Sequence, residues 1–106
     1  MRENVERAVK KFEREHPRLY KANKLFFNLL FKPDVWESIE NKMRRWFACG
    51  GRVFLIVFPN ALSGRGKHHS EIVVKVTRSG KVKIFKGLYF SENYRREQKY
   101  HLFPMR

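Results

Sequence analysis

The sequence predicts an α+β fold in which three N-terminal helices pack on a three- to four-stranded antiparallel β-sheet, followed by a short C-terminal helix or tail. Apolar residues recur at helical spacing in residues 1–51, whereas residues 52–106 hold an apolar run and then alternating residues. With 106 residues, of which 42% are hydrophobic, the chain suits one packed domain and is too short for two. We therefore expect residues 1–106 to form a single domain, with a helical half (1–51) and a β-rich basic half (52–106).

Two prolines mark where the first two helices end. The first helix has apolar residues at i, i+3, i+4 and i+7, namely Val5, Ala8, Val9 and Phe12. It ends at His16, because a residue before a proline avoids the helical conformation. Pro17 suits the first position of a second helix, which we expect to continue to Lys32. Its expected buried face consists of Leu19, Ala22, Phe26, Leu29 and Leu30.

The third helix has clear signals at both ends. Asp34 is the expected N-cap, and Glu37 three residues later completes a capping box. Gly50-Gly51 stops the helix. Its apolar side consists of Val35, Trp36, Ile39, Met43, Trp46 and Phe47.

Three strands are expected in the second half. Val53–Phe58 is apolar on both faces, which indicates a strand in the middle of the sheet with both sides covered. Strands are also expected at about Glu71–Thr77 and Lys81–Phe85, and Arg78-Ser79-Gly80 joins them. A three-residue loop with Gly80 in the left-handed conformation keeps the apolar residues on one face.

This register makes specific predictions about cross-strand neighbours. Val76 faces Val82, and Val74 faces Ile84, so that one face of the hairpin is apolar. The opposite face carries Thr77, Lys81, Lys75, Lys83, Val73 and Phe85.

Three further features are expected in the C-terminal region. Leu88-Tyr89-Phe90 is a candidate fourth strand, after a bulge or sharp turn at Gly87. Ser91 is the expected cap of a short helix through Arg95, Arg96 and Lys99. The residues Leu102-Phe103-Pro104 are expected to form a docked tail.

The charge of the chain points to a polyanionic partner. The chain has 24 Lys and Arg against 10 Asp and Glu, a formal net charge of +14, which exceeds what solubility requires. Residues 1–51 hold 12 basic and 7 acidic side chains, and residues 52–106 hold 12 basic and 3 acidic ones. The β-rich half is therefore the expected binding surface, and nucleic acid is the expected partner.

Two features of this half suit a phosphate backbone and stacked bases. Lys75 would lie opposite Lys83, and a phosphate between them would relieve their repulsion, with Val73 and Phe85 as an apolar platform beside it. The loop Ser63–His69 combines glycines with cations, which suits close contact with phosphates. The alternative interpretation is that Val73 and Phe85 face a helix, that the lysines are merely solvated, and that the loop is an ordinary connection.

We therefore expect a basic, non-catalytic nucleic-acid-binding protein that prefers RNA to DNA, a preference that rests on aromatic and lysine residues sharing a sheet face. A ribonucleoprotein role is compatible with this function. The expected contact residues are Arg65, Lys67, His68, Lys75, Lys81, Lys83, Phe85, Arg95 and Arg96.

An alternative is a small metal-independent ribonuclease. His68 or His69 would be the general base for a ribose 2′-hydroxyl, and Lys75, Lys83 or Lys86 would stabilise the phosphorane. The group that protonates the leaving oxygen would be one of His101, Tyr89, Tyr94 and Tyr100. A helical half followed by a sheet with His, Lys and Tyr resembles the layout of small toxin ribonucleases. A second alternative is an interaction module for an acidic protein.

The last 50 residues or so also resemble the double-stranded RNA-binding domain. The resemblance consists of a basic loop with histidine from Gly66 onward, two strands, and a basic segment. In that family the closing helix begins with paired lysines and continues with alanines, whereas here Arg95-Arg96 is followed by Glu97-Gln98. No functional residue is carried over from it.

The cysteine count and the lengths of the apolar stretches exclude several kinds of site. A single cysteine, Cys49, excludes an intrachain disulfide and a cysteine-based zinc finger, and together with a charged N-terminus it favours a cytoplasmic protein. We expect no metal, no cofactor and no membrane span, since the longest apolar stretch, Leu25–Phe31, is far shorter than about 20 residues. The abundance of Lys, Arg and Glu with one Gln resembles a thermophile composition.

Overall fold

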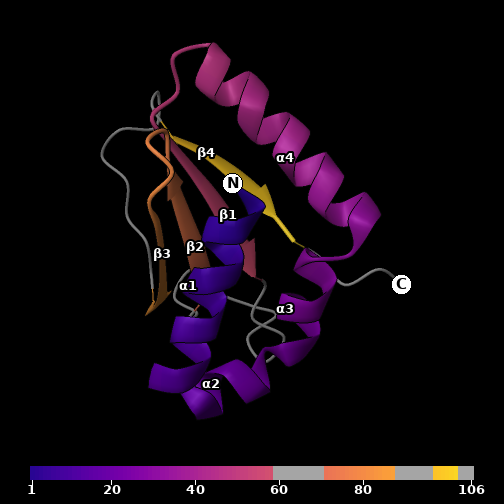
Figure 1. The fold of residues 1–106 in the computed structure, drawn as a ribbon, viewed down its shortest axis with the longest axis vertical. Coiled ribbons are helices and arrows are strands. Elements are labelled where there is room, and N and C mark those ends of the chain that lie inside the picture. Colours follow the sequence, from indigo (N-terminus) through magenta and orange to yellow (C-terminus); the bar gives the residue numbers. More distant parts are fainter. Residues whose placement is uncertain (59–70, 88–96, 103–106) are drawn as a thin grey trace.

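A computed structural model describes residues 1–58, 71–87 and 97–102 (Figure 1). Helices form the N-terminal half and strands follow, so the α+β class is confirmed. The elements are α1 (Arg2–Glu15), α2 (Pro17–Ala22), α3 (Lys24–Leu30), α4 (Pro33–Ala48), β1 (Val53–Phe58), β2 (Glu71–Thr77), β3 (Val82–Gly87) and β4 (Glu97–His101).

The strands form one sheet in the order β3-β2-β1-β4. β2 is antiparallel to both β1 and β3, which confirms the three-stranded antiparallel part of the prediction. β4 instead runs parallel to β1, so the expectation of a wholly antiparallel sheet is wrong. β1 thus lies between two neighbours, and five of its six residues are buried, as predicted for a central strand.

The expected short helix through Arg95, Arg96 and Lys99 is also wrong at Lys99, the one of these three residues that the structure describes. Lys99 lies in β4, paired with Leu55 of β1. Pairing satisfies backbone groups of β1 that would otherwise form an open sheet edge. Beyond the strand, Leu102 is buried and its N–H donates to the carbonyl of Val57 at 2.9 Å, so the chain is docked at this residue. Residues 88–90, 95 and 96 lie outside the described part of the chain.

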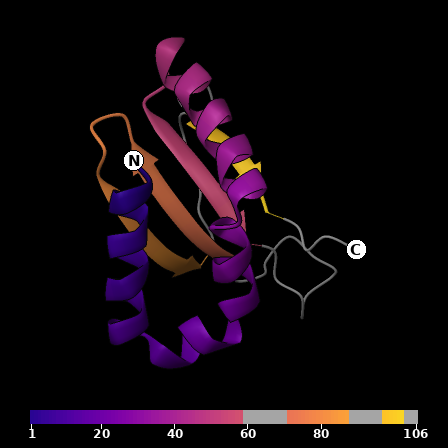
Figure 2. The same cartoon turned by 45° about the vertical axis from the view of Figure 1, so that its right-hand side comes forward.

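All four helices lie on one side of the sheet, with α1 toward β3 and α4 across β1 and β4 (Figure 2). The predicted apolar sides of the first and third helices are confirmed, since Val5, Val9, Phe12, Trp36, Ile39 and Met43 are all buried. They pack with the inward residues of the sheet, which are Phe54, Ile56, Phe58, Ile72, Val74 and Val76.

The expected second helix is interrupted at Asn23. This residue caps both α2 and α3, and its side-chain Nδ2 donates to the carbonyl of Leu19 at 2.9 Å. Asparagine side chains compete in this way with backbone hydrogen bonds, and here the helix changes direction. Ala22 is consequently exposed, and Phe27 is buried instead of it.

The expected capping box at Asp34 is wrong. The N-cap of α4 is Lys32, and Pro33 takes the first helical position, where its missing N–H costs nothing. Asp34 lies in the first turn, where a carboxylate favours the helix dipole without a capping hydrogen bond.

The end of α4 is tied to the start of β1. Gly50, with φ +94°, and Gly51 donate to the carbonyls of Phe47 and Trp46, which is the Schellman pattern. The indole of Trp46 covers Gly51 and its Nε1 donates to the carbonyl of Val53 at 2.9 Å. A Cβ on Gly51 would lie 2.2 Å from this ring, so the connection requires glycine.

The β2–β3 hairpin has the predicted register. Val76 pairs with Val82, Lys75 with Lys83, and Val74 with Ile84, and Gly80 has φ +92°. The hairpin turn is also attached to α1, because Nδ2 of Asn4 donates to the carbonyl of Gly80 at 2.9 Å.

Candidate functional site

The sheet face opposite the helices is apolar in part and basic in part. Leu55, Val57 and Val73 form a second buried cluster, against which Val53 and Phe85 pack. None of the four helices contributes to this cluster, so Val73 and Phe85 do not face a helix of the described chain. However, Val73 is 0% exposed and cannot serve as an open platform, whereas Phe85 is half-buried.

The accessible part of this face lies at the turn end of the hairpin. We call it the lysine corner, consisting of Lys75, Thr77, Lys81 and Lys83, with Phe85 at its border. Lys81 and Lys83 are exposed, and Lys75 and Thr77 are half-buried. Thr77 holds the turn, since its hydroxyl accepts from the N–H of Lys81 at 3.1 Å and lies 3.0 Å from the hydroxyl of Ser79.

Lys75 and Lys83 are direct cross-strand partners. Side chains in such pairs have Cβ atoms about 4.5–5.5 Å apart, and like charges there are destabilising. The ion pairs among the described residues join Arg2 to Glu6 and Arg44 to Glu40, and none of them involves the corner. Glu71, the acidic residue of the hairpin, is paired with Gly87 at the far end of β2. Neither cation therefore has an ion-pair partner among the side chains that the structure describes.

The lysines could protect the edge of the sheet or bind a ligand, and the position of each lysine in the sheet distinguishes these two explanations. β3 is an edge strand, and lysines on an edge commonly protect against pairing with other chains. That explains Lys81 and Lys83 without any ligand. It does not explain Lys75, which lies in β2 between two neighbouring strands and is half-buried.

The fourth strand extends the basic row. Lys83 pairs with Lys75, Lys75 with Leu55, and Leu55 with Lys99, so one row across the sheet contains three lysine positions. In the next row His101 pairs with Val57, which pairs with Val73. Sequence reasoning missed this alignment because it expected a helix at Lys99.

The structure brings together only part of the predicted site. Lys75, Lys81, Lys83 and Phe85 lie on adjacent strands. Tyr100, a candidate proton donor, is on the helix side of the sheet, where its hydroxyl contacts Ser38 Oγ at 3.4 Å and its ring lies under Lys42. It is therefore separated from the lysine corner by the sheet. The other predicted positions, Arg65, Lys67, His68, His69, Tyr94, Arg95 and Arg96, lie outside the described residues.

The described residues show neither a metal-binding cluster nor a membrane-spanning helix. Within residues 1–58, 71–87 and 97–102, no group of three or more His, Cys, Asp or Glu side chains is placed to hold a metal ion. None of the helices described has both the length and the apolar character needed to cross a bilayer.

Comparison with known proteins gave no relative, since no family model, no curated protein and no solved structure matches the chain.

Proposed function

We propose that this protein binds nucleic acid through the lysine corner and does not cleave it. The observation that carries the proposal is the opposition of Lys75 and Lys83 on neighbouring strands, with no ion pair to either among the side chains that the structure describes. A phosphate group between the two ammonium groups converts a repulsion into two charge-assisted contacts. The net charge of +14 supports a polyanion as the ligand.

RNA is proposed ahead of DNA. Phe85 is half-buried beside the lysine pair, in the row of the sheet next to it. An aromatic ring among cations on a sheet face is typical of proteins that bind single-stranded RNA. The loop containing Arg65 and Lys67, and the basic residues Arg95 and Arg96, are proposed as further phosphate contacts.

The test compares Lys75→Gln with a matched loss of charge elsewhere. Fluorescence anisotropy of labelled single-stranded RNA, duplex RNA and duplex DNA is measured over a series of salt concentrations. Loss of one phosphate contact should lower the salt slope by about 0.7 for a single strand and weaken binding several-fold. Lys21→Gln, at an exposed position of α2, removes the same charge and should leave both quantities near wild type. Equal effects of the two variants, or no binding by the wild type, would contradict the proposal.

The alternative function is cleavage of RNA without a metal. The parallel pairing of β4 favours it, because His101 occupies the row next to that of the lysine pair. In this alternative His68, His69 or His101 supplies the acid–base chemistry, and Lys75 and Lys83 stabilise the phosphorane. The same RNA samples, held in EDTA and run on a denaturing gel, test it. Cleavage that disappears on changing these histidines to alanine would replace the non-catalytic proposal, and binding of an acidic protein without RNA binding would replace both.

A further inference from the structure

A groove separates α1 from the edge strand β3. Its volume is about 260 Å³, and it is lined by Ala8, Lys11, Phe12, Glu15 and His16 of α1 and by Val82, Lys83 and Ile84 of β3. Drug-sized ligands occupy pockets of about 300–1,000 Å³, so this groove suits a smaller group such as one base.

The groove has an apolar floor and an aromatic wall. Phe12 is 5% exposed, and Val82 and Ile84 are half-buried members of the helix-side core. The ring of His16 lies beside that of Phe12, with centroids 5.0 Å apart, and His16 itself is exposed. A planar ring entering the groove therefore finds an apolar base and an exposed imidazole on which to stack.

The rim of the groove carries one ammonium group and one carboxylate on α1, those of Lys11 and Glu15. Neither Lys11 nor Glu15 forms an ion pair with another described residue, although they are four residues apart on one helix. Lys11 is thus available to a phosphate, and Glu15 to an exocyclic amino group of a base.

The groove borders the lysine corner at the edge of the sheet. Lys83 of the edge strand borders the groove, and its side chain lies on the opposite face, in the row of Lys75. A strand whose backbone lies on the corner can therefore turn around the edge of β3 and enter the groove.

We propose that the α1–β3 groove holds one nucleotide of the RNA strand bound at the lysine corner, with the base stacked on His16 and a phosphate at Lys11. This inference rests on the proposed function, which it extends by a subsite on the helix side of the sheet. It also predicts that the bound RNA is single-stranded where it passes the edge strand, because a paired base cannot enter a groove of this size.

The test fills the groove without changing the charge of the protein. In Ala8→Phe a ring occupies the space, and single-stranded RNA should bind about fivefold or more weakly, which corresponds to one lost stacked base. Ala48→Phe, at an exposed position at the end of α4, adds the same ring elsewhere and should bind like the wild type. His16→Ala is a second variant, for use if Ala8→Phe does not fold. His16 is exposed, so its replacement by alanine should not disturb folding. Lys11→Gln should weaken binding more than Lys10→Gln, its exposed neighbour outside the groove.

Backbone amide chemical shifts locate the nucleotide. Addition of a short single-stranded RNA should move the amides of residues 11–16 and 82–84, and these shifts should be lost in Ala8→Phe. If RNA binding depends on Lys75 while the groove variants bind like the wild type, the inference is overturned and the proposed function stands. If the wild type binds no RNA, both are overturned. Shifts with adenosine 5′-monophosphate but not with RNA would identify a free nucleotide as the occupant, which also overturns the inference.

Discussion

The indole Nε1 of Trp46 donates a hydrogen bond to the main-chain carbonyl of Val53 at 2.9 Å, and this bond connects the end of α4 to the first residue of the central strand. It spans only seven residues and links the longest helix to the strand that follows it. One side chain therefore contributes directly to the connection between the helical and the β-rich half.

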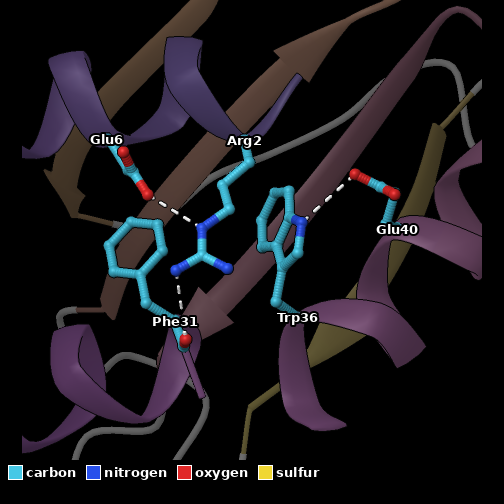
Figure 3. A network of polar contacts seen from close by, with 5 residues as sticks. All are labelled: Arg2, Glu6, Phe31, Trp36 and Glu40. Carbon is cyan, nitrogen blue, oxygen red and sulfur yellow. Dashed lines mark hydrogen bonds and ion pairs between the residues drawn. The ribbon is translucent and has the colours of Figure 1, made fainter. Parts of the chain in front are cut away.

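Replacing Trp46 by phenylalanine should destabilise the protein by about 0.5–1.5 kcal/mol, because the hydrogen bond from the indole to the Val53 carbonyl is lost. The matched control is Trp36→Phe. Its Nε1 donates to Glu40 Oε2 at 3.1 Å within the same helix, so that bond does not link two elements (Figure 3). The free energy of unfolding in urea, followed by circular dichroism, measures both. Amide hydrogen exchange of α4 is measured on the same variants. Loss of protection in Trp36→Phe but not in Trp46→Phe would contradict the role given to the Trp46 hydrogen bond.

Gly51→Ala should be more destabilising than Gly50→Ala. A Cβ at position 51 meets the Trp46 ring at 2.2 Å, so the indole must move and lose its bond to Val53. Position 50 has open space, and the cost there is about 1 kcal/mol for a side chain at positive φ. A double-mutant cycle with Trp46→Ala checks the cause, since the effect of Gly51→Ala should shrink when the ring is absent. Additive effects would show that the clash is not the reason.

Asn4→Ala should weaken the attachment of α1 to the hairpin. The bond from its Nδ2 to the Gly80 carbonyl is part-buried, and its loss should cost about 1 kcal/mol. Amide hydrogen exchange should speed up around residues 78–81 in this variant. Arg7, which donates to the Asn4 side chain, is exposed, so Arg7→Ala serves as the control and should leave those amides near wild type.

Arg2→Ala should be more destabilising than Glu6→Ala. The two side chains form an exposed pair at 2.8 Å, a type worth about 0.3–0.5 kcal/mol. Arg2 additionally lies over the Phe31 ring and donates to the Phe31 carbonyl at 3.5 Å, which joins α1 to the end of α3 (Figure 3). Thermal melting at low and high salt separates the contributions, because salt should abolish most of the Glu6 effect and less of the Arg2 effect.

Lys75→Gln should stabilise the protein while weakening RNA binding. Removing one of two opposed ammonium groups relieves up to about 1 kcal/mol of repulsion, and the gain should fall as salt rises. A lysine that only keeps the sheet soluble would not combine these two effects. Urea unfolding of Lys75→Gln and Lys83→Gln, with anisotropy on the same samples, provides the check. A loss of stability in Lys75→Gln would show that the ammonium group has a favourable partner.

Local patterns predicted the elements whose neighbours are close in sequence. The hairpin register followed from the alternation around Gly80, and the opposition of Lys75 and Lys83 followed from that register. The break at Asn23 was missed because one asparagine gives little local signal against strong helical periodicity on both sides.

Features that depend on distant contacts could not be predicted. Glu97–His101 has no apolar alternation, and it becomes a strand by pairing with β1, more than 40 residues earlier. The burial of Val73 and the groove beside His16 likewise arise from tertiary packing. Of the candidate site, therefore, only the lysine corner could be predicted from the sequence.

The bond between Asn4 and Gly80 joins residues that are 76 positions apart. During synthesis at about 5–20 residues per second, α1 leaves the ribosome several seconds before the turn to which it is attached. An isolated helix of this length is marginal in water, so its apolar stripe of Val5, Val9 and Phe12 must wait uncovered or transiently unfolded. The apolar stripe of the N-terminal helix therefore lacks its partners in the sheet until the hairpin has been synthesised.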